Sequence, residues 1–301
     1  MLNFQPIRIT DKGEIEKHLK LYNFRACELG FANLFIWRLR CEVQFCIDEG
    51  FLFMWSYGDD KKIYYIMPVG NGDLAKAVNK LIDHAREAGH PLIFASLTAE
   101  MKNLLESAMP GRFEYAENRD VADYIYLSES LITLSGKKLH SKRNFINRFY
   151  QDYGDRITAE PINPDDLAEL REFHIKWCEN LNNPESIELE TCAILQAFRH
   201  YNALGLNGLV LRVGGRIVAF SFGSRLSSDT FDVHVEKADS EYAGAYAVIN
   251  NMMAKEYGSE FTYMNREEDM GLEGLRKAKL SYQPEIILYR YNAVLKGEQI
   301  D

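Results

Sequence analysis

The residues best suited to chemistry follow an apolar, aromatic run near the end of the chain that is expected to form a strand. They are the polar residues of the sequence Asn-Arg-Glu-Glu-Asp-Met-Gly, which begins at residue 265. A junction between a strand and a helix commonly faces the ligand crevice of mixed α/β folds. The pattern predicts catalytic roles for Glu267 and Asp269, and substrate binding by Asn265, Arg266 and Glu268.

The same acids also have a plain structural interpretation. The helix expected after Gly271 carries Arg276, Lys277 and Lys279 in its later turns, and acids before a helix with cations at its end suit the helix dipole. The acids could therefore cap this helix or pair with its cations. To bind a metal ion, these acids would need further oxygen ligands, and the sequence pattern indicates none, so no metal site is predicted. The three cations are predicted to bind substrate.

A second candidate site lies on the strand expected over Asp229–Lys237. Apolar and ionisable residues alternate along it, which places Asp232, His234 and Glu236 on one face. A histidine beside a carboxylate can act as a general base toward an amine or a hydroxyl, so His234 and Glu236 are predicted to be catalytic. The alternative is a half-exposed polar sheet face on which Glu236 forms an ion pair with Lys237.

A third candidate is a basic stretch in the middle of the chain, expected to be a helix capped by Ser135. Its cations stand at the positive end of the helix dipole, where they are unfavourable unless an anion binds there. We therefore predict a binding site for phosphate or RNA. The alternative is a solvated basic face that balances acids elsewhere. The predicted binding residues are Lys137, Lys138, His140, Lys142, Arg143 and Arg148.

The composition limits the class of protein. The chain has 301 residues, which favours about two domains of roughly 150 residues each. A formal net charge of -9 argues against a protein that coats nucleic acid or an anionic membrane with its whole surface, although it permits a local basic site. The five cysteines lack metal-type spacing and are predicted to be reduced thiols, as in the cytosol.

No targeting or membrane segment is predicted. The N-terminal residues lack the basic and then apolar layout of a signal peptide. The longest apolar run, Gly50–Tyr57, is far too short to span a bilayer. The sequence therefore predicts a soluble cytoplasmic protein.

Hydrophobic periodicity and turn residues predict the same order of elements, β-α-α-β-β-β-α-β-α-β, in both halves. In the first half the predicted helices are 11–22, 29–37, 73–88 and 99–108, and the predicted strands are 4–9, 38–48, 51–57, 62–67, 92–95, 113–115 and 122–127. In the second half the predicted helices are 164–178, 189–204, 244–257 and 272–280, and the predicted strands are 157–161, 208–213, 216–225, 229–237, 261–265 and 285–291.

This order is similar to the GCN5-related N-acetyltransferase (GNAT) fold, and two copies in tandem resemble the aminoacyl-transferring relatives of that superfamily. The resemblance implies an α+β (mixed α/β) fold with two tandem GNAT-like domains, which are acyl-CoA N-acyltransferase-like. Each would be a mixed, mostly antiparallel sheet flanked by helices. The predicted divisions are an N-terminal domain 1–132, a packed, basic helical junction 133–155 and a C-terminal domain 156–301.

GNAT acetyltransferases wrap the coenzyme A pyrophosphate in a (Gln/Arg)-x-x-Gly-x-(Gly/Ala) loop at the start of a helix. The corresponding stretch of this chain matches that pattern only at Gly244, which is the predicted cofactor-binding residue. Glu241 stands where Gln or Arg is expected and would repel pyrophosphate, and Tyr246 stands where a small residue is expected. An acyl-CoA donor is therefore the less favoured prediction.

Two longer segments resemble a bacterial family grouped with the C-terminal domain of phosphatidylglycerol lysyltransferase. They are Gly-Lys-Lys-Leu-His-Ser-Lys-Arg-Asn-Phe-Ile-Asn-Arg-Phe from Gly136 and Asn-Arg-Glu-Glu-Asp-Met-Gly-Leu-Glu-Gly-Leu-Arg-Lys-Ala-Lys-Leu-Ser-Tyr-Gln-Pro from Asn265. The stretches Val218-Ala219-Phe220 and His234-Val235-Glu236-Lys237-Ala238 are similar too. The resemblance spans essentially the whole chain. It implies transfer of an aminoacyl group from charged tRNA to an amine or a lipid hydroxyl.

The sequence therefore favours an acyl- or aminoacyltransferase. Its donor would be aminoacyl-tRNA or another phosphate-bearing molecule, held by the basic stretch. Its acceptor would be a small molecule, a peptide or a lipid headgroup, deprotonated by His234 or Glu236. The alternatives are a coenzyme A-dependent GNAT acyltransferase and a non-catalytic GNAT-like binding module.

Overall fold

The computed structural model describes residues 2–179 and 184–297. The chain forms two compact units, of which the first consists of Met1–Asp123 with Leu288–Asp301 and the second of Tyr124–Ile287. Both have mixed α+β architecture, with a mostly antiparallel sheet and packed helices. The predicted fold class is confirmed.

The first unit has the strand order β1-β2-β3-β4-β5-β12, in which β4 and β5 are parallel and the other pairs are antiparallel. Its strands are β1 (Gln5–Pro6), β2 (Gln44–Asp48), β3 (Phe51–Tyr57), β4 (Ile63–Gly70), β5 (Ile93–Leu97) and β12 (Ile286–Leu295). Its helices are α1 (Lys12–Leu19), α2 (Phe31–Cys41), α3 (Leu74–Ala88) and α4 (Ala99–Ala108).

The second unit has the strand order β6-β11-β10-β9-β8-β7, in which only β10 and β11 are parallel. β6 (Phe113–Leu127) begins in the first unit and enters the second unit at Tyr124. The other strands of the second unit are β7 (Ile157–Pro161), β8 (Asn207–Val213), β9 (Arg216–Arg225), β10 (Thr230–Ala238) and β11 (Tyr263–Asn265). Its helices are α5 (Ser128–Thr133), α6 (His140–Tyr153), α7 (Leu167–Glu179), α8 (Pro184–Arg199), α9 (Tyr201–Leu204), α10 (Ala245–Glu256) and α11 (Glu273–Leu280).

In both compact units, strands from the two halves of the chain pair with one another. In the first unit β5 pairs with β12, the last strand of the chain, and in the second β11 pairs with β6, the last strand of the first half. Each half thus supplies a strand to the other unit. The junction helix α6 also belongs to the second unit. Periodicity reports the order of strands but not the partner of each strand, so this exchange could not be inferred from the sequence.

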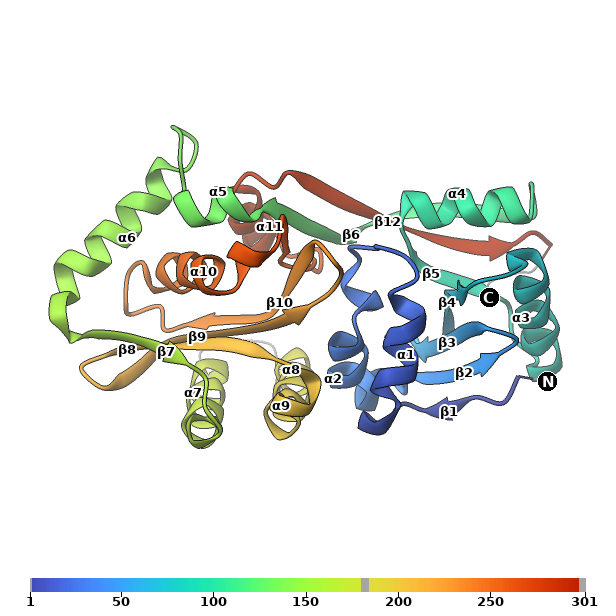
Figure 1. Ribbon diagram of the computed structural model, residues 1–301, viewed down its shortest axis with the longest axis horizontal. Coiled ribbons are helices and arrows are strands. Elements are labelled where there is room, and N and C mark those ends of the chain that lie inside the picture. Colours follow the sequence, from blue (N-terminus) through green and yellow to red (C-terminus); the bar gives the residue numbers. More distant parts are fainter. Residues whose placement is uncertain (1, 180–183, 298–301) are drawn as a thin grey trace. The chain divides into compact units, whose positions relative to one another are not determined.

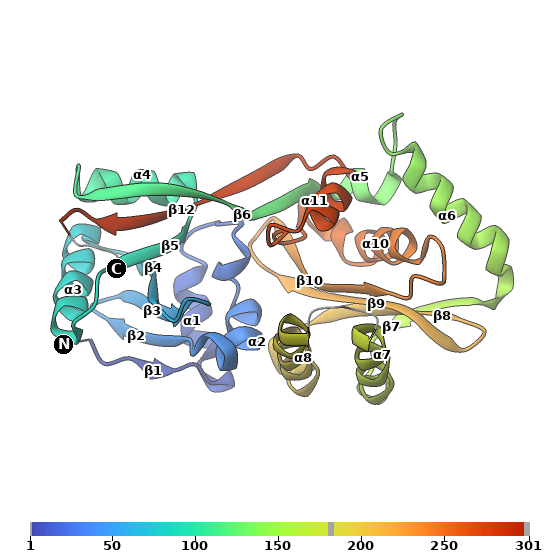
Figure 2. The same cartoon turned by 180° about the vertical axis from the view of Figure 1, so that it is seen from behind.

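Helices cover both faces of the sheet in the second unit (Figure 1). On one face α10 packs beside α5 and α6, and Phe231 of β10 stacks on Tyr257 at the end of α10 with ring centroids 6.1 Å apart. On the other face α7 and α8 lie below β9, as Figure 2 shows from behind. Phe220 and Phe222 of β9 project to that side, where they meet Phe198 of α8 at 6.0 and 5.8 Å.

Several predicted boundaries are wrong, and the strands predicted at 113–115 and 122–127 form the single strand β6. The strand expected from Arg38 is shorter, because Arg38–Cys41 finish helix α2, which ends where Glu42 adopts a left-handed conformation with φ of 49°. The junction helix α6 begins at His140 and has Leu139, not Ser135, at its N-cap. Gly136, with φ of 82°, turns the chain between Ser135 and the helix.

Among the described residues no helix is both long enough and apolar enough to cross a membrane.

The exchanged strand β12 is tied into the first unit by a buried ion-pair network. Arg290 is fully buried and donates to the Asp123 carboxylate and, at 3.1 Å, to Glu28. Asp123 is itself fully buried and also accepts from the Cys27 amide. Removing the guanidinium would leave a buried carboxylate without its cation.

We expect Arg290→Leu to lower the free energy of unfolding by about 3–5 kcal/mol, because a broken buried ion pair leaves an uncompensated charge. Urea denaturation measures this loss. Arg86→Leu is the control, because Arg86 pairs with Asp83 at the surface, 3.3 Å apart, and should contribute less than about 1 kcal/mol. Equal losses in the two variants would contradict the structural role of Arg290.

Candidate functional site

A β-bulge at His234 divides the polar residues of β10 between two faces. The register with β9 shifts between Val233 and Val235, so His234 is the inserted residue. Phe231 and Val233 pack in the core beneath α10, and after the bulge that face is taken over by Ala238 and Glu236. The prediction that Asp232, His234 and Glu236 share one face is therefore wrong. Simple alternation of side chains fails where an extra residue is inserted.

His234 lies in a cluster with Asp232, Glu267 and Ser224, which we call the His234 cluster. Its Nδ1 is 3.0 Å from Glu267 Oε1 and 3.5 Å from Asp232 Oδ2, and its Nε2 is 2.9 Å from Ser224 Oγ. The imidazole is only 1% exposed. Burial lowers the pKa of His234 to about 4, so the ring is neutral at pH 7.

Glu236 lies on the α10 side of the sheet in a second group, the Glu236 cluster. Arg266 Nη2 donates to Glu236 Oε1 at 2.8 Å, and Asn250 Nδ2 of α10 donates to Oε2 at 2.9 Å. Burial acts against the charge of Arg266, but the Glu236 carboxylate raises its pKa, so the guanidinium stays charged. Glu236 therefore pairs with Arg266. The predicted alternative partner Lys237 instead contacts Glu190 at 2.7 Å.

Two buried polar atoms in the Glu236 cluster have no hydrogen-bond partner. They are Asn250 Oδ1, an acceptor, and Arg266 Nη1, a donor. Asn250 is 1% exposed and the Arg266 side chain is 11% exposed. Buried polar atoms are nearly always satisfied, so such a pair marks a place for a ligand that both donates and accepts. Sequence reasoning missed Asn250, although a polar residue between apolar ones on a buried helix is a usable signal.

Aromatic rings connect this cluster to the basic helix α6. The Arg266 guanidinium lies over the Tyr282 ring at 4.7 Å, and Lys142 Nζ of α6 lies over the same ring at 4.0 Å. Burial, with a smaller contribution from Arg266, lowers the pKa of Lys142. The structure thus brings Lys142, Arg266 and Glu236 together from three separate segments. Tyr282 was not among the predicted site residues.

The other cations of the basic stretch have different surroundings. Arg143 donates to the carbonyl oxygens of Leu134 and Gly136, so it holds the turn that precedes α6. Arg148 is exposed and lies 3.5 Å from the carboxylate of Asp152. Lys137, Lys138 and His140 are exposed at the start of the helix. The two lysines remain available to contact a large anionic ligand, whereas the ring nitrogens of His140 contact Arg143 at 3.4 Å and Asn144 at 3.2 Å.

The loop after β11 is held from within by Asp269 and Lys279. Asp269 is fully buried and accepts from Arg276 at 2.8 and 2.9 Å, from the Gly271 amide at 2.9 Å, and from the Tyr124 hydroxyl. Burial alone would raise the pKa of Asp269, but these donors lower it to about 2. Asp269 and Arg276 therefore hold the loop in place, and their catalytic and binding roles stay predictions.

Lys279 also holds the loop after β11 in place. Its ammonium is buried and donates to the backbone carbonyl oxygens of Arg266, Glu267 and Glu268. Asn265, also fully buried, turns the loop by accepting from the Glu267 amide at 2.7 Å. The predicted residues Asn265 and Lys279 therefore orient the loop. The side chain of Glu268 is half-buried, and Lys277 is exposed.

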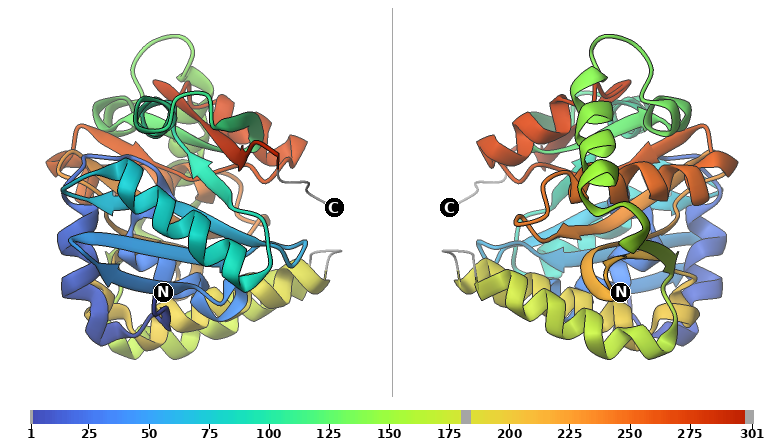
Figure 3. Two further views of the ribbon diagram at one scale, coloured as in Figure 1. Left: turned by 90° about the vertical axis from the view of Figure 1, so that its right-hand side faces the viewer. Right: turned by 90° about the vertical axis from the view of Figure 1, so that its left-hand side faces the viewer.

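Gly244 is required by close packing at the start of α10. A Cβ on this residue would lie 2.6 Å from the Phe145 carbonyl oxygen and 3.3 Å from the Phe149 Cβ, both of α6. Its φ of 97° also disfavours other residues. Figure 3 (right) shows α6 beside α10. The backbone of α6 thus occupies the side of Gly244 on which its missing Cβ would stand.

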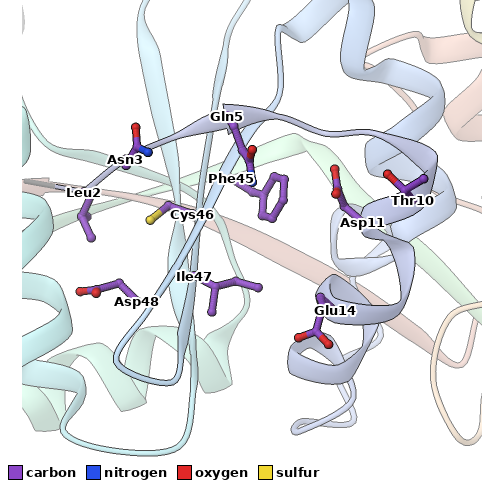
Figure 4. A pocket seen from close by; sticks show the side chains of 10 residues that line it. All are labelled: Leu2, Asn3, Gln5, Thr10, Asp11, Glu14, Phe45, Cys46, Ile47 and Asp48. Carbon is purple, nitrogen blue, oxygen red and sulfur yellow. The ribbon is translucent and has the colours of Figure 1, made fainter.

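The first unit has a separate hollow of about 480 Å³. It is bordered by the acids Asp11, Glu14 and Asp48 and by the Cys46 thiol (Figure 4). None of the residues predicted to act in catalysis or binding lines it.

Comparison with known proteins places these residues in a family. Residues 19–294 match the family described as phosphatidylglycerol lysyltransferase, C-terminal. An uncharacterized protein of Mycoplasmoides gallisepticum is 28% identical over 174 residues, which is 56% of this chain and 54% of that protein. The chain thus spans about half the length of that relative.

Two solved structures are similar over almost the whole chain. A conserved protein of unknown function from Bacteroides thetaiotaomicron has 43% sequence identity and a TM-score of 0.94, with 98% of this chain and 100% of that chain covered. L-PGS from Bacillus licheniformis has 17% identity and a TM-score of 0.67, with 96% and 93% covered. At that identity the second likeness shows the shared fold.

We expect Asp269→Asn to lower the free energy of unfolding by about 2 kcal/mol at pH 7, as a depression of the pKa from 3.8 to about 2 implies. A lowered folded-state pKa stabilises above pH 4, and this contribution is lost as the pH falls toward 2. The difference between wild type and variant should therefore shrink across that window in urea denaturation. Asp152→Asn, an exposed carboxylate, is the control and should change little at any pH. A difference that stays constant from pH 7 to 2 would contradict the ion pair.

Proposed function

This chain belongs to the family of phosphatidylglycerol lysyltransferase C-terminal domains, and on that premise we propose that it moves an aminoacyl group from charged tRNA to an amine or hydroxyl acceptor. The observation that carries the proposal is the pair of unsatisfied buried atoms, Asn250 Oδ1 and Arg266 Nη1, beside the Glu236 carboxylate. An aminoacyl ester offers a matching donor and acceptor, because it has an α-ammonium group next to a carbonyl oxygen.

Each polar group of the cluster has a role in such a transfer. Asn250 Oδ1 accepts a hydrogen bond from the α-ammonium of the aminoacyl group. Arg266 Nη1 donates to the ester carbonyl oxygen and stabilises the negative charge that develops there. Glu236 takes the proton from the acceptor as its nitrogen or oxygen attacks the carbonyl carbon.

The bonds and protons of this reaction balance without a further reagent. The acceptor forms an amide or ester bond to the carbonyl carbon, while the ester bond to the ribose oxygen breaks. The proton held by Glu236 then passes to that ribose oxygen. Because the ester is already activated, positioning and one general base suffice. The predicted base His234 is 1% exposed on the other side of β10, so Glu236 is the better candidate.

The basic start of α6 is the proposed binding site for the tRNA phosphates. Lys137 and Lys138 are exposed in the turn that precedes α6, while Lys142 in the first turn of the helix reaches the Tyr282 ring beside Arg266. One helix therefore connects a cationic surface to the proposed transfer site. Salt-dependent binding through such lysines is typical of protein–nucleic acid contacts.

Coenzyme A is the less favoured donor. The glycine that would approach its pyrophosphate, Gly244, packs against the backbone of α6, and Glu241 brings negative charge to the same loop. Melting temperatures distinguish the donors, because a ligand that binds only the folded state raises the melting temperature. A rise with acetyl-coenzyme A and none with charged tRNA would replace this proposal with the acyltransferase. Binding of charged tRNA without turnover would favour the non-catalytic module.

We expect Glu236→Gln to lower kcat by about 10²–10⁴, the range typical of a lost general base. Because the change also removes the counter-charge of the buried Arg266, circular dichroism must show that the variant is folded at the assay temperature. Turnover is measured as loss of ester-bound labelled amino acid from charged tRNA, with phosphatidylglycerol vesicles or ethanolamine as acceptor. The matched control is Glu241→Gln, an exposed carboxylate near the start of α10, which should retain full turnover. Unchanged turnover in Glu236→Gln would remove Glu236 from the mechanism.

If the tRNA phosphates bind these lysines, removing the lysines should change the salt dependence of tRNA binding. Changing both Lys137 and Lys138 to Ala should weaken tRNA binding and lower the slope of log K against log salt by about 2, because each lysine lost releases about one counterion fewer. Fluorescence anisotropy with labelled tRNA measures both quantities. Changing Lys20 and Lys76 to Ala is the control, since these lysines are also exposed, at 66% and 63%. The same slope in both double variants would show that tRNA does not bind at α6.

A further inference from the structure

The His234 cluster takes no part in the proposed transfer, yet it brings together three side chains that commonly bind metals. His234 Nδ1, Asp232 Oδ2 and Glu267 Oε1 converge from β10 and from the loop after β11. Single ligand atoms from these three residues all lie within 4.8 Å of one another. Asp232 is fully buried and the Glu267 side chain is 15% exposed, so the group is nearly closed to solvent.

The separations fit one bound ion. Ligands about 2.1 Å from a metal lie about 3.0 Å apart at a right angle and about 3.4 Å apart in a tetrahedron. The observed separations from Nδ1 are 3.0 Å to Glu267 and 3.5 Å to Asp232. Only small side-chain movements would therefore be needed for all three atoms to reach one ion.

The fold positions these ligands through three independent features. The bulge in β10 sets the direction of the His234 ring. Parallel pairing of β10 with β11 places Asp232 opposite Asn265, and the loop held by Lys279 then presents Glu267. On β9, Ser224 lies opposite Asp232 and meets His234 Nε2 at 2.9 Å. A partner at the second ring nitrogen fixes the tautomer of metal-bound histidines.

We propose that Asp232, His234 and Glu267 form a binding site for one divalent transition-metal ion. In this arrangement His234 Nε2–H donates to Ser224 Oγ, and Nδ1 keeps its lone pair for the ion. One imidazole with two carboxylates suits Mn²⁺, Fe²⁺, Co²⁺ or Zn²⁺ better than Ca²⁺ or Mg²⁺, which prefer oxygen ligands throughout. The partly exposed Glu267 marks the side from which water or a substrate oxygen would complete the coordination.

The competing arrangement has a proton in place of the metal. In that case His234 Nδ1–H donates to Glu267, and the cluster is a hydrogen-bonded support for the loop. The two arrangements differ in a measurable way, because only the first takes up an ion in a defined ratio to protein.

The test uses the full chain without an affinity tag, treated with EDTA and then titrated with Mn²⁺. Mn²⁺ is the main probe because the chain also contains five cysteines, which favour Zn²⁺. We expect one Mn²⁺ per chain, seen as loss of the free-ion electron paramagnetic resonance signal, together with a rise in melting temperature. His234→Ala and Glu267→Gln should each weaken binding by at least about 100-fold, and Ser224→Ala by about 10- to 100-fold.

Glu241→Gln is the control, because this carboxylate is exposed and lies outside the His234 cluster. It should bind Mn²⁺ as the wild type does. Circular dichroism establishes that each variant is folded. If the ligand variants fail to fold, the visible spectrum of the Co²⁺-loaded wild type reports whether nitrogen and oxygen ligands surround the ion. No uptake of Mn²⁺ or Co²⁺ by the wild type, or uptake unchanged in folded Glu267→Gln, would overturn the proposal.

Discussion

The second unit depends on how the loop between β11 and α11 is held. The ammonium of Lys279 donates to three consecutive carbonyl oxygens, those of Arg266, Glu267 and Glu268. A cation buried among backbone oxygens fixes their directions, and with them the directions of the side chains they carry. Arg266 can then meet Glu236 while its neighbour Glu267 meets His234. One buried cation thus orients the residues of both polar clusters.

The bulge in β10 places the Glu236 cluster and the His234 cluster on opposite faces of one strand. Without the inserted residue, Glu236 would share a face with His234, and one mixed cluster of carboxylates and imidazole would result. With it, Glu236 faces α10 beside Arg266 and Asn250, while His234 faces Ser224 and Asp232. A site for transfer and a site for a metal ion can therefore be built on adjacent residues of one loop.

Many residues of the two clusters could be selected from the sequence. Arg266, Glu267, Glu236, His234 and Lys142 were all selected by residue type and spacing, and the structure places each in one of the two clusters. Asn250, Ser224 and Tyr282 were missed, because each is an ordinary residue in its own segment. Their importance comes from residues elsewhere along the chain. Asn250 contacts Glu236, 14 positions away, and Ser224 contacts His234, 10 positions away. Tyr282 lies under the guanidinium of Arg266 and the ammonium of Lys142, which come from two other segments.

The sequence by itself determined the family, through the residues that the chain shares with it. It also determined the mixed α+β class and the order of the elements, because hydrophobic periodicity and turn residues act over short distances along the chain. Only the tertiary structure decided that β6 pairs with β11 and that β12 pairs with β5. It also decided that Gly244 packs against Phe145, and that Asp232, His234 and Glu267 converge. These features depend on contacts between distant segments and on one inserted residue. A local sequence pattern cannot predict these features, because it indicates the period of a strand but not which strand pairs with it.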